Sequence, residues 1–150
     1  MTVTQWIAVA GVAAAVVGSA VAIFTGLKGV RDQLRVNVFL TYTERYAKIM
    51  SDVPSEARRP GAEYHLNLRP VEERDRVRSA FREYLNLCSE EMWLHDHRRI
   101  DHATWHIWEQ GMRQVAQFPS FRDAWEFLAC EYEYYGTFKN FVSKELLHDA

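Results

Sequence analysis

The sequence has few cysteines, and their positions exclude most cysteine chemistry. Its 150 residues include two, Cys88 and Cys130. They form no CxxC motif and no spacing typical of a zinc site, and one pair cannot build the disulfide framework of a small secreted domain. Two unpaired thiols are typical of a reducing compartment such as the cytosol.

Motifs of the common catalytic sites are also missing. The sequence contains no Gly-rich phosphate loop, no nucleophile elbow and no HExxH zinc motif. Charge of one sign is not in excess, since 18 basic residues stand against 20 acidic ones. This balance lacks the basic footprint of a nucleic-acid-binding protein. We therefore predict no nucleic-acid partner and no cofactor.

Charged residues are absent between Val3 and Leu27. An uncharged apolar run of this length predicts a transmembrane helix. A secretory signal peptide is the alternative, with Gly18-Ser19-Ala20 as its cleavage site, but no basic residue precedes the run. We expect an uncleaved anchor over residues 1–30. Basic residues follow the run, so the positive-inside rule places the N-terminus outside and the domain over residues 31–150 in the cytoplasm.

Small residues recur at every fourth position of this run and would share one face of a helix. They are Ala10, Ala14, Gly18, Ala22 and Gly26. In lipid, such faces allow close packing of helix backbones. The expected partners are therefore the bilayer and other transmembrane helices, from a second copy or from a membrane complex. Chance is the alternative, because small residues fill most of the run.

The remaining sequence predicts an all-α fold, with one transmembrane helix followed by a small cytoplasmic bundle of four to five helices. Apolar residues recur with helical spacing, and no segment alternates with the period of a strand. Prolines between Pro54 and Pro70 predict a surface connection. Asp101 is expected to cap one helix and Pro119 to start another. Gly136 is expected to end a helix before a short final one.

Histidines and acidic residues near positions 91–109 raise the possibility of a metal site. The candidate ligands are Glu91, His95, His102 and His106. Spacing of four residues places His102 and His106 on one helix face, and imidazole with carboxylate suits zinc or iron. The alternative, which we favour, is a buried hydrogen bond between Glu91 and His95 with solvated histidines around a turn. We therefore assign no metal site.

A second candidate surface lies on the polar side of the predicted helix that carries Glu91 and His95. It comprises Arg82, Asn86, Glu90 and Trp93. A tryptophan among polar residues is unusual on a solvated face, so either the chain itself or a partner covers it. By contrast, Cys88 lies on the apolar face, where a thiol behaves as a small hydrophobic side chain. No catalytic residue is assigned.

Several motifs resemble an uncharacterised family of small bacterial membrane proteins. They are Tyr84–Glu91 (YLNLCSEE), Trp105-x-x-Trp108, Gly111-Met112, Pro119-x-Phe121 and Ala124-Trp125. The resemblance implies a single N-terminal span, a helical domain and a bacterial inner-membrane location. It implies no activity.

The expected function is that of a membrane-anchored, non-catalytic interaction module or an accessory subunit of an inner-membrane assembly. Two alternatives stay open. One is a membrane-bound metal-binding protein or enzyme that uses the cluster at 91–109. The other is a defence or stress effector that multimerises through its span.

Overall fold

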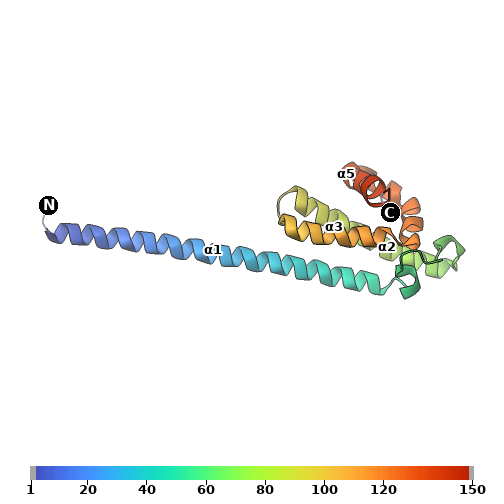
Figure 1. Ribbon diagram of the computed structural model, residues 1–150, viewed down its shortest axis with the longest axis horizontal. Helices are drawn as coiled ribbons and strands as arrows, with labels where there is room; N and C mark the ends of the chain where they lie inside the picture. The colour runs from blue at the N-terminus through green and yellow to red at the C-terminus, as the bar shows by residue number, and fades with distance from the viewer. Residues whose placement is uncertain (1–2, 149–150) are drawn as a thin grey trace. The chain divides into compact units, whose positions relative to one another are not determined.

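The computed structural model describes the backbone of residues 3–148 and the side chains of residues 25–148, and all regular elements in this part are helical (Figure 1). The elements are α1 (Val3–Ser51), the 3₁₀ helices η1 (Ser55–Arg58) and η2 (Leu66–Leu68), α2 (Val71–Asp96), α3 (His102–Ala116), α4 (Pro119–Leu128), the 3₁₀ segment η3 (Ala129–Tyr135), α5 (Gly136–Asn140) and the π-helical η4 (Phe141–Leu146). The predicted all-α class is confirmed.

The predicted transmembrane helix is corrected by the structure. Within the described residues, no helix is both long and apolar enough to cross a bilayer. α1 continues past the apolar run, and Lys28, Arg31 and Arg35 follow within about two turns. The single-span architecture is therefore not retained. Side chains 1–24 of the apolar run lie outside the described residues, and the orientation and location inferred from them stay predictions.

The predicted packing row lies on the same part of the chain. Ala10, Ala14, Gly18 and Ala22 fall outside the described side chains. Gly26 is described and exposed, and a Cβ built on it would meet no atom within 4 Å. No close helix contact at Gly26 is therefore seen.

The chain divides into two units, one ending at Leu40 and the other beginning at Thr41. The C-terminal part of α1 belongs to the second unit and packs there through its aromatic and apolar side chains. Tyr42 stacks on Trp108 of α3 with ring centroids 5.1 Å apart, and Tyr46 meets Tyr84 of α2 at 5.9 Å. Ile49 and Met50 lie in its core.

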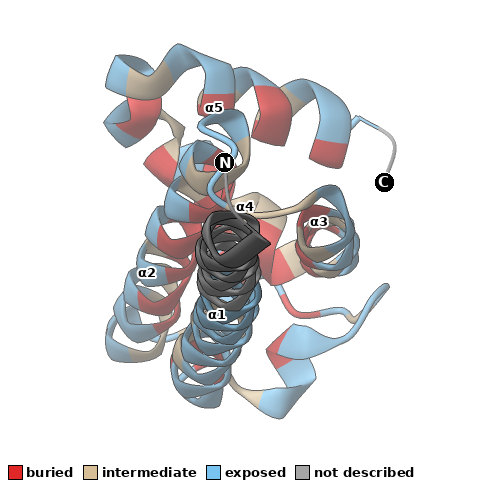
Figure 2. Cartoon of the chain, turned by 90° about the vertical axis from the view of Figure 1, so that its left-hand side faces the viewer, coloured by how far each residue is buried: buried red, intermediate tan, exposed pale blue. Residues whose placement is uncertain are grey.

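Aromatic residues fill the core of the second unit. Phe81 and Tyr84 of α2 both contact Phe121 of α4 edge to face, at 5.4 and 6.0 Å between centroids. Tyr132 of η3 contacts Phe138 of α5 at 5.5 Å. The buried positions form stripes along the helices (Figure 2). The predicted apolar faces are therefore the faces that pack.

The predicted helix starts are confirmed at α3 and α4. The Asp101 carboxylate accepts a hydrogen bond of 2.8 Å from the backbone N–H of Thr104, and Pro119 opens α4. The predicted helix boundary at Gly136 is confirmed, because η3 ends at Tyr135 with Gly136 as its C-cap residue and the short helix α5 begins there. The Gly136 backbone has ordinary helical angles, φ −56° and ψ −32°, so glycine here does not mark a left-handed helix end.

The proline-containing connection is held more firmly than a surface loop. The Ser120 hydroxyl donates a hydrogen bond of 2.6 Å to the carbonyl of Ala57. The backbone N–H of Leu66 donates one of 2.8 Å to the Asp123 carboxylate. Ala57 and Leu66 are fully buried, so residues 51–70 cover one side of α4.

Candidate functional site

An aromatic groove lies at the C-terminal half of α2, and we call it the Trp93 groove. It is lined by Tyr42, Ser89, Glu90, Trp93, Leu94, Tyr134 and Tyr135. Its volume is about 290 Å³, at the small end of ligand pockets. The lining residues come from α1, α2 and η3, which tertiary packing alone brings together.

Trp93 is the central exposed side chain of this groove. It is 46% exposed, although large aromatic residues are usually buried. Its ring stacks on His97, one turn later in the chain, at 4.3 Å between centroids. His97 Nδ1 also lies 2.9 Å from the Trp93 carbonyl. The neighbouring histidine thus orients the indole and leaves a large part of it open to solvent.

The α1 wall of the groove is fixed by the Glu90 carboxylate. Arg45 donates two hydrogen bonds to Glu90, of 2.6 and 3.1 Å, and the Tyr42 hydroxyl donates a third of 3.2 Å. The hydrogen bonds from Arg45 hold the pKa of Glu90 below its usual range. Burial and the adjacent carboxylate raise the pKa of Tyr42. Glu90 is therefore ionised at neutral pH and Tyr42 is not.

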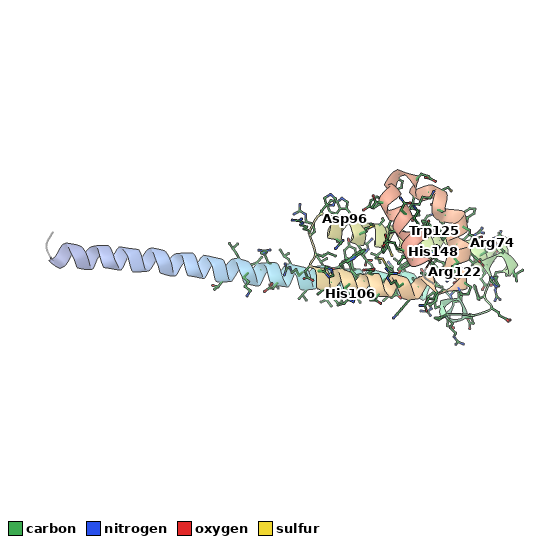
Figure 3. All side chains as sticks on the ribbon, turned by 45° about the horizontal axis from the view of Figure 1, so that its top comes forward. Arg74, Asp96, His106, Arg122, Trp125 and His148 are labelled. Atoms are coloured by element: carbon green, nitrogen blue, oxygen red, sulfur yellow. The ribbon has the colours of Figure 1, made fainter. Side chains whose placement is uncertain are left out.

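Hydrogen bonds of Tyr132 join the η3 wall to α2. Its hydroxyl donates to the Asn86 side chain at 2.9 Å and lies 3.2 Å from the carbonyl of Arg82. Tyr134 follows with 79% of its surface exposed. Burial, with a hydrogen bond to the Asp96 carboxylate, raises the pKa of Tyr135. Figure 3 labels Asp96 at the C-terminal end of α2.

Of the four residues of the predicted partner surface, Glu90 and Trp93 line the groove together, and Arg82 and Asn86 lie outside its lining. Arg82 pairs with Glu131 through hydrogen bonds of 2.7 and 2.8 Å, and Asn86 accepts from Tyr132. Glu90 pairs with Arg45. Three of the four side chains thus contact other parts of the chain itself, whereas Trp93 stays 46% exposed.

Sequence reasoning did not identify the tyrosines of the groove. Tyr134 and Tyr135 belong to the aromatic, acidic run 131–135, and Tyr42 lies on α1. The run itself was the available signal, because tyrosine combines an apolar ring with a polar hydroxyl and is enriched at interfaces.

The proposed metal ligands are not brought together. Glu91 is buried, His95 stacks on Trp105 at 4.5 Å, and the His95 ring lies 3.5 Å from Asp96. His102 and His106 are exposed on α3 (Figure 3). Within residues 25–148, no three His, Cys, Asp or Glu side chains are grouped closely enough to hold a metal ion. The expected hydrogen bond between Glu91 and His95 does not form either, since His95 contacts Asp96 and Trp105.

Cys88 and Glu91 are buried titratable groups on the inner face of α2. Burial raises the pKa of the Cys88 thiol well above its ordinary value, so the thiolate is disfavoured. Burial also raises the pKa of Glu91 to about 8. Both groups are therefore uncharged near neutral pH, and Glu91 adds no negative charge beside the groove.

Comparison with known proteins gives no match: no family model, no curated protein and no solved structure is similar to this chain. The family resemblance noted from the sequence motifs stays a prediction.

Proposed function

We propose that this chain is a non-catalytic helical interaction module that receives a segment of a protein partner in the Trp93 groove. The observation that carries the proposal is the exposure of both Trp93 and Tyr134 in the lining of one groove. Tryptophan and tyrosine are enriched among the residues that dominate binding energy at protein interfaces.

The walls of the groove are preorganised. The Arg45–Glu90 pair fixes α1 to α2, and the hydrogen bonds of Tyr132 fix η3 to α2. A groove whose walls do not have to be ordered on binding loses less entropy, which favours affinity from a small contact area. The volume of about 290 Å³ suits one or two partner side chains better than a large cofactor.

The reactive groups of α2 support a binding role. Cys88 faces the core with its thiol protonated, and Glu91 is buried beside it as a neutral acid. Both side chains are buried, where no substrate has access. Glu90, the charged residue of the groove lining, is paired with Arg45.

Site-specific photo-crosslinking tests the proposal. A photoreactive phenylalanine analogue replaces Tyr134 in the full chain, expressed in the cells from which the protein comes. We expect a discrete protein adduct that is lost when Trp93→Ala is added. The matched control carries the analogue at Phe127, which is 52% exposed on α4 and outside the groove. Equal adducts from both positions, or an adduct that persists in the Trp93→Ala background, would overturn the proposal.

A further inference from the structure

The chemistry of the Trp93 groove indicates the charge of its occupant. Of its seven lining residues, four are aromatic and Glu90 alone is charged. Aromatic rings present a negative face, and cations bind over such faces when a carboxylate lies nearby. Lining of this composition is typical of sites that receive a positively charged nitrogen.

The chain itself places cations on rings in this manner. The Arg45 guanidinium carbon lies 5.1 Å from the centroid of Tyr42 while the same side chain pairs with Glu90. Arg78 lies 4.3 Å from the ring of Phe127 on α4. The edge of the groove at Tyr42 thus already holds an internal cation. Trp93 and Tyr134 are the more exposed rings, with 46% and 79% of their surfaces open.

The lining of the groove favours a basic occupant over an acidic one. It includes the Glu90 carboxylate and no basic side chain, and Glu90 is paired with Arg45. A carboxylate entering the groove would meet Glu90 and the negative ring faces, whereas an ammonium or guanidinium group would be attracted by the ring faces.

We infer that the segment bound in the Trp93 groove is basic and inserts a lysine or arginine side chain between Trp93 and Tyr134. The inference rests on the proposed function and names the chemistry of the partner. The apolar stem of such a side chain packs on Leu94 and the ring edges, and its charged head lies over the indole face.

Capped peptides that differ only in the charge of one side chain test this inference on the full-length protein. The probes are an alanine peptide carrying lysine, the same peptide carrying norleucine, which keeps the stem and lacks the ammonium, and the same peptide carrying glutamate. Binding is followed through the Trp93 indole N–H resonance. We expect saturable binding of the lysine peptide, weaker binding of the norleucine peptide by about two- to fivefold for each ring engaged, and no shift with glutamate.

Variants locate the effect. Trp93→Leu and Tyr134→Leu keep apolar bulk and remove a ring, so each should weaken lysine-peptide binding by about two- to fivefold. In Trp93→Leu, where the reporting resonance is lost, calorimetry replaces it. Phe127→Leu removes an exposed ring outside the groove and should leave binding unchanged.

Each other outcome separates this inference from the proposed function. Equal affinity for the lysine and norleucine peptides would overturn the inference and leave an apolar docking groove. A Trp93-dependent crosslink with no response to any peptide would also overturn it and leave the proposed function standing. Binding of choline without binding of the lysine peptide would identify a quaternary ammonium ligand in place of a basic protein segment.

Discussion

The buried carboxyl group of Glu91 makes the stability of this fold depend on pH in a predictable direction. Its side chain lies in the core face of α2 with 6% of its surface exposed. Burial raises its pKa from the ordinary value of 4.5 to about 8. Between these two values the native state holds a proton that the unfolded state has lost. The free energy of unfolding therefore falls as the pH rises.

The size of the effect follows from the two pKa values. Each pH unit between them costs about 1.4 kcal/mol of stability for one proton. From pH 5 to pH 7 this amounts to about 2.5 kcal/mol, less than two full units because the unfolded carboxyl group is still partly protonated at pH 5, and the decrease levels off above pH 8. The stability associated with the protonated form is complete below pH 4.5 and is lost as the pH rises toward 8.

The perturbation is Glu91→Gln, which keeps the shape and removes the titration. We expect the variant to gain about 2.5 kcal/mol relative to the wild type between pH 5 and pH 7. Urea unfolding at several pH values from 5 to 8 measures the difference. Other titrating groups contribute equally to both proteins, so they cancel in it.

The control is Glu83→Gln, the same chemical change at an exposed position of the same helix. Its stability difference from the wild type should vary by only a few tenths of a kcal/mol over this range. If the wild type and Glu91→Gln instead show parallel pH profiles from 5 to 8, the carboxyl group is ionised in the folded state and the reasoning fails.

Three further substitutions test the packing and the local contacts by thermal or urea unfolding. Phe121→Ala should destabilise the fold by about 3–5 kcal/mol, because its ring is buried against those of Phe81 and Tyr84. Phe127→Ala, on the exposed side of α4, should cost much less. Similar costs for the two variants would contradict the assigned core. Asp101→Ala should cost about 1 kcal/mol through loss of the α3 cap, and Asp101→Asn should retain most of it. Arg45→Met should cost at most about 1 kcal/mol, because its pair with Glu90 is half exposed, and the loss should shrink in high salt; a salt-independent loss would indicate a packing role instead.

The prediction of a transmembrane helix rested on the composition of one segment, and the structure does not bear it out. The uncharged run up to Leu27 met the usual length criterion, but α1 continues as one helix to Ser51 and the part with described side chains is charged. The boundary predicted at Gly136 coincides with the end of η3, but not through a left-handed glycine. Gly136 has ordinary helical angles, and η3 is already irregular at Tyr132.

Local patterns in the sequence determined the helical class, the caps at Asp101 and Pro119, and the buried faces of α2 to α4, because helix periodicity and capping involve residues within a few positions of one another. Tertiary structure alone decided which side chains of this surface stay accessible to solvent. Arg82 pairs with Glu131, 49 positions away, and Glu90 pairs with Arg45, 45 positions away. Trp93, by contrast, keeps 46% of its surface exposed. Pairing across such separations depends on how whole helices pack, and no local pattern encodes it. The groove therefore exists only in the folded chain.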